Sequence, residues 1–479
     1  MDLINASSPE FLAQFDQLFK RFDYHEYSEE SMSKPEWKNL VKAGVLLPII
    51  PKKHGGRENN EEIYLLLEKA AYYNLGLAMY LNTAILLFTR SIIGHGTEKL
   101  KEEVIADLLT HGSCGGFAVI EPETGTGISL IQTYFEEVTA GYKITGKKHW
   151  QCFSESADWW LIVAKDKRMG SAGDKFDLFV HKSASGGFKT QQRYATVGLK
   201  LIDFGLNEIE VTVPEYARLQ MNSATVSDLL NLVISGAWGQ WASLSAGFLK
   251  RIQEESLSFT AQRRTATGTL KDLGYVKYRL GMIASAHHIC RAIFNYLMQH
   301  INLGDTGTND MFVVQSAKLL AADYMFDAAV HYQALCGGDG YRYQPEGNIS
   351  AYAMQDARAF AILGVANDIL YELLAKDFLN QQVSQKEKSF YTMIQGFGHT
   401  SKASVYLESN RHLLEKIPIN NTELVFAGKI LARLFGITAI EHSAATLSAA
   451  ERSAAIAFSL SEITNILTAL SFAADIAIE

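Results

Sequence analysis

Two segments place turn residues beside residues that could contact a bound molecule. In the first, the apolar run 117–120 stops at a Glu-Pro pair, and a turn that contains Gly125 follows. The chain then returns through a hairpin-like stretch that ends on the aromatic residue Trp150. The second segment, 336–341, is a glycine-rich turn far downstream. Because glycine lets the backbone approach a ligand closely, both turns are candidates for a binding site.

Motifs of several other chemistries do not occur in the sequence. The four cysteines are far apart and form no Cys-x-x-Cys pair, so neither a zinc site nor a disulfide framework is expected. We expect reduced thiols in a cytoplasmic protein, because the first residues also lack the pattern of a signal peptide. The stretch 264–269 lacks the lysine of a Walker loop, and no His-Glu-x-x-His or Gly-x-Ser-x-Gly motif is found.

Length and charge limit the class of protein. A chain of 479 residues exceeds one ordinary core, and 48% hydrophobic residues are typical of a folded protein. The net charge of −8 provides no basic excess to neutralise phosphates. A general nucleic-acid binder is therefore not expected.

The spacing of apolar residues changes twice along the chain. Helical spacing comes first, with a left-handed helix end expected at Gly44. Alternating or β-branched runs then predict antiparallel strands at 117–120, 129–137, 142–145, 159–164, 176–181 and 208–213. Long helical patterns return at 229–254, 273–303, 309–335 and 355–376. We predict an α+β, mainly α protein with an N-terminal helical domain (1–113), a β domain (114–222), a helical bundle (223–377) and an additional helical domain (378–479).

The apolar stretch 454–478 is long enough to cross a membrane. Glu462, Asn465 and Asp475 interrupt it. We therefore expect a helix buried in a bundle and no membrane span, with a membrane anchor as the lesser alternative.

The order of these motifs resembles the acyl-CoA dehydrogenase family of flavoproteins. The resemblance covers roughly residues 35–376. It rests on separate motifs in the same order, which include Trp37, Gly44, Gly55-Gly56, Gly96-Thr97-Glu98, the Glu-Pro turn, Trp150, Gly198-Leu199-Lys200, Gly337-Gly338 and Asp356-Ala357-Arg358. It implies N-terminal helices, a central antiparallel β domain and a C-terminal four-helix bundle, to which this chain adds further helices.

The resemblance also implies a bound FAD. In the family, FAD lies between the β domain and the helical domain, and its ADP half reaches across a dimer interface, so a homodimer or homotetramer is implied. The matching cofactor positions are Phe117, Val119, Ile120, Gly125, Thr126, Trp150, Cys152, Arg264, Gly337 and Gly338. Ile120 and Cys152 replace threonines that hydrogen-bond the flavin, and a thiol is a weaker donor than a hydroxyl.

The catalytic carboxylate of the family is missing, because Gly364 occupies its position. General-base assistance is worth about 10²–10⁴ in rate. Two carboxylates could substitute. Asp228 is one residue from an alternative position, near Leu229, that some members use, and Asp368 is one turn beyond Gly364 if that segment is helical. Both also fit a structural role, as a helix N-terminal charge or an exposed residue.

Three functions follow from the resemblance. The first is an acyl-CoA dehydrogenase-like oxidoreductase on an acyl thioester with a relocated base. The second is a flavin-dependent monooxygenase or oxidase, which does not need that base. The third is a non-catalytic binding or partner subunit, and the fold does not decide among them.

Overall fold

The computed structural model describes residues 3–26, 30–125, 127–168, 175–221, 224–303, 310–343, 347–382, 389–415 and 421–476. The chain forms two compact units. The first contains Met1–Ala237 and Asn302–Asn309, and the second contains Trp238–Ile301 and Asp310–Glu479.

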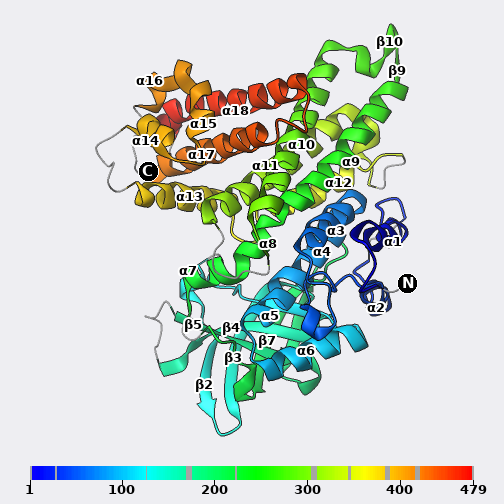
Figure 1. Ribbon diagram of the computed structural model, residues 1–479, viewed down its shortest axis with the longest axis vertical. Coiled ribbons are helices and arrows are strands. Elements are labelled where there is room, and N and C mark those ends of the chain that lie inside the picture. Colours follow the sequence, from blue (N-terminus) through cyan, green and yellow to red (C-terminus); the bar gives the residue numbers. More distant parts are fainter. Residues whose placement is uncertain are drawn as a thin grey trace. The chain divides into compact units, whose positions relative to one another are not determined.

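The first unit begins with helices that pack apolar faces into one core. They are α1 (Ser8–Lys20), α2 (Lys34–Lys42), α3 (Asn60–Tyr73), α4 (Leu75–Asn82), α5 (Arg90–His95) and α6 (Glu98–His111), and the π-helical turn η2 (Thr83–Thr89) joins α4 to α5 (Figure 1). Gly44 follows α2 with φ at 89°, which confirms the predicted left-handed helix end.

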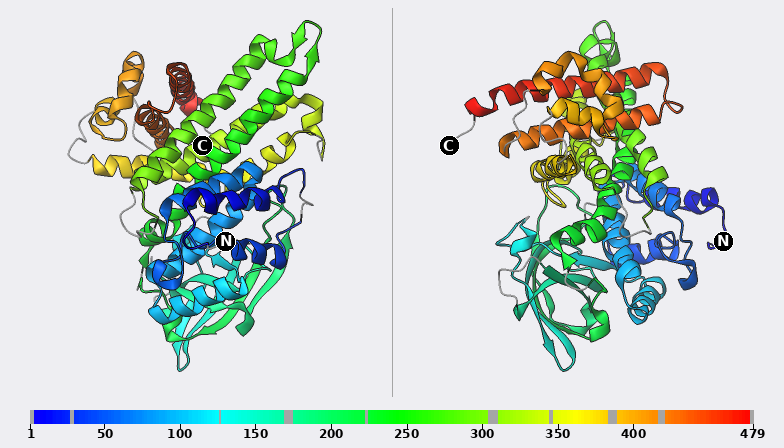
Figure 2. Two further views of the ribbon diagram at one scale, coloured as in Figure 1. Left: turned by 45° about the vertical axis from the view of Figure 1, so that its right-hand side comes forward. Right: turned by 60° about the vertical axis from the view of Figure 1, so that its left-hand side comes forward.

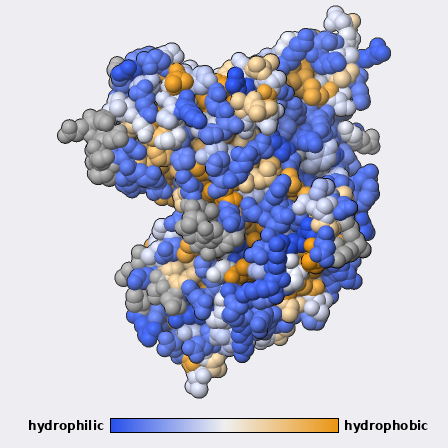
Figure 3. Space-filling model, in the orientation of Figure 1, coloured by the Kyte–Doolittle hydropathy of each residue, from blue (hydrophilic) through white to orange (hydrophobic). Residues whose placement is uncertain are grey.

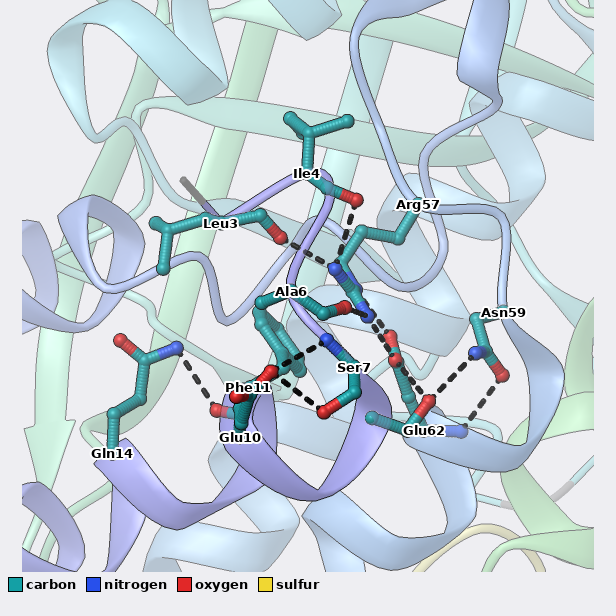
Figure 4. A network of polar contacts seen from close by, with 11 residues as sticks. Leu3, Ile4, Ala6, Ser7, Glu10, Phe11, Gln14, Arg57, Asn59 and Glu62 are labelled. Carbon is teal, nitrogen blue, oxygen red and sulfur yellow. Dashed lines mark hydrogen bonds and ion pairs between the residues drawn. The ribbon is translucent and has the colours of Figure 1, made fainter. Parts of the chain in front are cut away.

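A buried ion pair fixes the chain that leads into α1. Glu62 is fully buried and accepts a hydrogen bond from Arg57 Nε at 2.7 Å. The Arg57 guanidinium also donates to the backbone carbonyls of Leu3, Ile4 and Ala6 (Figure 4). The guanidinium therefore replaces the hydrogen bonds that these carbonyls would otherwise make with water.

A sheet follows the helices and completes the first unit. Its strands are β1 (Gly115–Ala118), β2 (Tyr134–Val138), β3 (Gly141–Cys152), β4 (Trp159–Asp166), β5 (Lys175–Lys182), β6 (Phe188–Tyr194), β7 (Phe204–Val213) and β8 (Ala224–Thr225). The order is β6-β7-β3-β2-β4-β5-β8, with β1 beside β4. A short helix α7 (Val226–Asp228), a π-helical turn η7 (Leu229–Ile234) and α8 (Ser235–Gly239) come next.

The prediction of a wholly antiparallel sheet is wrong for two strand pairs. Strand β4 runs parallel to β1 and to β2 and antiparallel to β5. The hydrophobic pattern gives the spacing of side chains along a strand but not the direction of its neighbour. The sheet is therefore mixed, and its central strand β4 is buried along most of its length.

The second unit is helical. It contains α9 (Trp241–Gln262), the hairpin β9 (Arg264–Thr265) and β10 (Gly268–Thr269), α10 (Gly274–His300), α11 (Met311–Cys336), the 3₁₀ turn η9 (Gly337–Tyr341), α12 (Ser350–Phe360) and α13 (Asn367–Gln381). The C-terminal helices are α14 (Phe390–Gly396), α15 (Ser401–Ser404), α16 (Arg411–Leu414), α17 (Asn421–His442) and α18 (Ala449–Ile476), with the 3₁₀ segment η11 (Val405–Asn410) before α16. Helices α17 and α18 lie side by side (Figure 2).

Two described helical segments are long and apolar enough to cross a membrane by length and composition. The segment Leu75–His95 has 89% of its apolar window buried, as in the core of a folded unit. For Ala449–Ala473 the buried share is only 33%, so the prediction of a buried helix holds for one face alone. The other face exposes small and polar residues, among them Ala457, Ser461 and Thr464, together with the aromatic Phe472. The face of the protein in Figure 3 is mostly hydrophilic, with separate hydrophobic patches.

Candidate functional site

Trp150 lies at an irregular point of strand β3. The register between β3 and β7 shifts between His149 and Gln151, and Trp150 has φ at 57°. A left-handed conformation is unfavourable for a bulky residue, and such strain is concentrated at functional sites. The indole is 48% exposed, and its ring centroid is 4.5 Å from that of Tyr194. The fold therefore presents a flat aromatic surface at a fixed position.

The predicted contact residues before the Glu-Pro turn lie next to this bulge. The carbonyl oxygen of Ile120 accepts hydrogen bonds from His149 N at 2.9 Å and from Gln151 Nε2 at 3.2 Å. Val119 and Ile120 are half-buried, and Phe117 is buried in β1. The structure thus places residues 117–120 and Trp150 in one part of the first unit, as a shared binding site requires.

A buried ion pair between Lys148 and Glu121 contacts the segment that contains Val119 and Ile120. Lys148 Nζ lies 2.9 Å from Glu121 Oε1 and donates to the Val119 carbonyl at 2.9 Å. Glu121 also accepts the backbone N–H of Thr133 at 2.9 Å. Burial lowers the pKa of Lys148 to about 8, even though Glu121 favours the charged amine. Burial alone would raise the pKa of Glu121, but Lys148 and the backbone donors lower it.

Cys152 is the last residue of strand β3 and lies close to the π-helical turn η2, which contains Thr83. Its sulfur lies 3.8 Å from Thr83 Oγ1, which itself donates to the Met79 carbonyl. Burial raises the pKa of the Cys152 thiol, so the group is a weak neutral donor at neutral pH. The hydroxyl near Cys152 is thus buried and already donates to the Met79 carbonyl, so it does not replace the donor of the threonine expected at position 152.

Gly125 is exposed with φ at 50°, and a Cβ there would have no neighbour within 4 Å. It pairs with Glu121 in an isolated bridge, which closes the turn. Thr126 lies outside the described residues. The turn leaves backbone accessible next to a carboxylate that is already neutralised by Lys148.

The second glycine turn and Arg264 belong to the other unit. Gly337 and Gly338 are exposed, and a Cβ on either would meet no atom within 4 Å. Arg264 is exposed in the β9–β10 hairpin, and its neighbour Arg263 forms an ion pair with Asp339 at 2.8 Å. The Arg263–Asp339 ion pair therefore places the start of the hairpin next to the glycine turn, and the Arg264 side chain itself is exposed.

The segment that carries Gly364 is a turn and not a helix. The pattern at 355–376 predicts one helix, but α12 ends at Phe360 and α13 begins at Asn367. Gly364 and Val365 have φ at 61° and 81°. Asp368 therefore does not lie one turn along the same helical face as Gly364, and that premise of the sequence prediction is wrong.

Both candidate bases have structural partners. The Asp368 side chain is 80% exposed and lies 3.6 Å from Lys429 Nζ of α17. Asp228 accepts hydrogen bonds from Thr225 N at 2.8 Å and Thr225 Oγ1 at 2.7 Å in a capping box, which lowers its pKa. A catalytic role for either carboxylate stays a prediction.

Two residues that lie beside Gly364 were not among the site residues predicted from the sequence. Lys318 of α11 is fully buried, and its amine donates to Val365 O at 2.9 Å and to Asn367 Oδ1 at 2.6 Å. Burial lowers the pKa of Lys318 to about 7. Trp238 is 1% exposed, and its Nε1 lies 3.0 Å from the place where a Cβ on Gly364 would be. A buried lysine and tryptophan at this spacing carry no sequence signal, because both are ordinary in helical patterns.

Comparison with known proteins agrees with this architecture. The N-terminal domain of acyl-CoA dehydrogenases matches residues 14–111, and their C-terminal domain matches residues 239–379. The chain belongs to the acyl-CoA dehydrogenase family.

One curated relative is the mitochondrial long-chain specific acyl-CoA dehydrogenase of Rattus norvegicus. It is 25% identical over 370 residues, which cover 74% of this chain and 82% of that protein. An acyl-CoA dehydrogenase from Bacillus anthracis, solved with FAD, has a TM-score of 0.76 at 16% identity and covers 98% of this chain and 87% of its own. Butyryl-CoA dehydrogenase from Megasphaera elsdenii has a TM-score of 0.68 at 20% identity and covers 78% of this chain and 99% of its own. The two solved structures support the fold.

Proposed function

We propose that this protein is a cytoplasmic flavin-dependent oxidoreductase that acts on an acyl thioester. The observation that carries the proposal is the exposed Trp150, which a left-handed backbone holds beside the half-buried Ile120. A flavin needs a flat apolar wall and a few fixed hydrogen-bonding groups. The first unit offers both, and the free thiols of all four cysteines suit a reducing compartment.

The residues of the second unit fit the phosphate part of FAD. Arg264 supplies a cation, and Gly337 and Gly338 leave their backbone open. When bound, FAD supplies the electron acceptor for oxidation of the substrate. Because the family's ADP half reaches into a neighbouring subunit, we also propose a homodimer or homotetramer.

The chemical step separates two forms of this function. Dehydrogenation needs a base for the α-proton, and Gly364 cannot provide one. A monooxygenase or oxidase on the same scaffold does not need that base. The exposed Gly364, at the position where the family carries the base, therefore favours the monooxygenase or oxidase. Anaerobic mixing of the FAD-loaded protein with acyl-CoA thioesters tests the first form, which predicts loss of the oxidised flavin band. No loss of the band, with oxygen uptake when a flavin reductase is added, would support the second.

A pair of substitutions tests the relocated base. If Asp228 or Asp368 accepts the α-proton, its replacement in D228N or D368N should lower turnover by about 10²–10⁴ and leave the bound flavin unchanged. Turnover is measured with an artificial electron acceptor, and flavin content by absorbance. Because the Asp368 side chain is 80% exposed, Glu372→Gln on the same helix serves as a control for the loss of a surface charge. Unchanged turnover in both variants would exclude these carboxylates.

A further inference from the structure

Gln151 directly follows Trp150, and its side chain folds back onto the bulge of strand β3. The residue is 3% exposed. Its amide Nε2 donates to the His149 carbonyl at 2.7 Å and to the Ile120 carbonyl at 3.2 Å. Both acceptors are carbonyl oxygens, so only the NH₂ end of the amide can occupy this position. One side chain therefore joins the peptide that leads into Trp150 to the segment that contains Ile120.

The backbone at Trp150 needs support of this kind. Trp150 has φ at 57°, and the register of β3 on β7 shifts between its two neighbours. A left-handed conformation is unfavourable for a bulky residue, and it persists only where the surrounding structure fixes it. The Ile120 carbonyl also accepts the His149 N–H at 2.9 Å. The amide of Gln151 thus completes a set of three hydrogen bonds immediately before the bulge.

A glutamine is not the side chain that stability alone would favour at this buried position. The Oε1 atom of Gln151 has no hydrogen-bond partner among the described residues. A buried polar group that is only half satisfied is less favourable than an apolar side chain of similar size. The two carbonyls, in contrast, require a donor, and the glutamine supplies it.

We propose that Gln151 is a positioning residue for the cofactor, because its amide fixes the backbone of Trp150 and thereby the indole on which the flavin packs. This inference rests on the proposed function. Tyr194, whose ring centroid lies 4.5 Å from that of Trp150, contacts the indole once the backbone is fixed. Gln151 acts through Trp150 and Ile120, the two residues that the proposed cofactor site uses.

The exposure of Trp150 provides a direct readout. All six tryptophans of the chain lie among the described residues, and the five others are at most 3% exposed, against 48% for Trp150. Quenching of tryptophan fluorescence by iodide therefore reports the Trp150 indole. Gln151→Met removes both hydrogen bonds at nearly the same side-chain length. It should change the iodide-quenchable fraction of the apoprotein, and its affinity for FAD, measured by flavin absorbance, should fall about tenfold.

Two further variants separate this role from a general loss of stability. Gln191→Met is the matched control, because Gln191 is exposed on β6 and donates to Glu208 at 3.0 Å. It should bind FAD as wild type does. Gln151→Glu carries a carboxyl group, which donates only when it is protonated, and burial raises the pKa of a carboxyl group. Its FAD affinity relative to wild type should therefore be lowest near about pH 8 and should recover towards about pH 6.

Wild-type FAD affinity in Gln151→Met would overturn the inference alone. If Gln151→Met does not fold, the same conclusion would follow from a Gln151→Glu variant whose FAD affinity relative to wild type does not change with pH. A wild type that does not bind FAD would contradict the proposed function and, with it, the role of Gln151 toward the cofactor. Iodide quenching of the apoproteins would still decide, in that case, whether Gln151 fixes Trp150.

Discussion

Lys148→Met is expected to destabilise the protein by about 3 kcal/mol or more, because it leaves Glu121 as an unpaired buried carboxylate. The side chains of Lys148 and Glu121 are 0% and 4% exposed, so water cannot replace the lost partner. Lys148 also donates to the Val119 carbonyl, and its loss should loosen the segment that contains Ile120. Urea unfolding measures the first effect, and FAD affinity measures the second.

Lys143→Met is the control for this substitution. Lys143 lies on the same strand and pairs with Glu210 at 2.9 Å, but the two side chains are 39% and 69% exposed. An exposed pair of this kind contributes about 0–1 kcal/mol. Equal loss of stability in the two variants would show that the Lys148–Glu121 pair does not hold the segment.

Arg433→Met is expected to cost about 3 kcal/mol and to release the C-terminal helices first. The Arg433 side chain is 7% exposed on α17. It contacts Asp323 at 3.1 Å, Glu462 at 3.0 Å and the Tyr371 hydroxyl at 3.1 Å. These partners belong to α11, α18 and α13, so one guanidinium connects the additional helices to the rest of the second unit. Its removal leaves the carboxylates of Asp323 and Glu462 poorly solvated and without their cation. Removing one partner of a buried ion pair in this way strongly destabilises a protein.

Arg452→Met provides the comparison within the same helices. Arg452 lies 3.8 Å from Glu441, and its side chain is 40% exposed, so its removal should change stability by less than about 1 kcal/mol. Hydrogen exchange should show faster opening of α17 and α18 in the Arg433 variant only. Faster exchange that is uniform over the whole chain would contradict the local role of Arg433.

The periodicity of apolar side chains predicted those helices and strands that depend only on neighbouring residues in the sequence. The helix end at Gly44 and most strands of the sheet follow from side-chain spacing and turn residues. Strand β6 was not predicted, because the residues of 188–194 are mostly polar and exposed. The direction of β4 depends on strands far away in the sequence, and no local pattern encodes it.

The turn at Gly364 could not be predicted for a different reason. A single glycine is tolerated in a helical pattern, and Val365 is β-branched, so a left-handed conformation there is unfavourable locally. The conformation is maintained by Lys318, whose amine reaches Val365 from 47 residues away in the sequence. Sequence resemblance assigns the position of the family's carboxylate to Gly364, and only the structure shows the Trp238 indole next to it.

The visible absorption spectrum of the purified protein, before and after addition of excess FAD, tests the central claim most directly. The account predicts a flavin spectrum that stays with the protein after gel filtration, and a lower FAD content in Trp150→Ala than in the control Trp159→Phe. A colourless protein that does not take up FAD would contradict the proposed oxidoreductase and would favour a non-catalytic partner subunit.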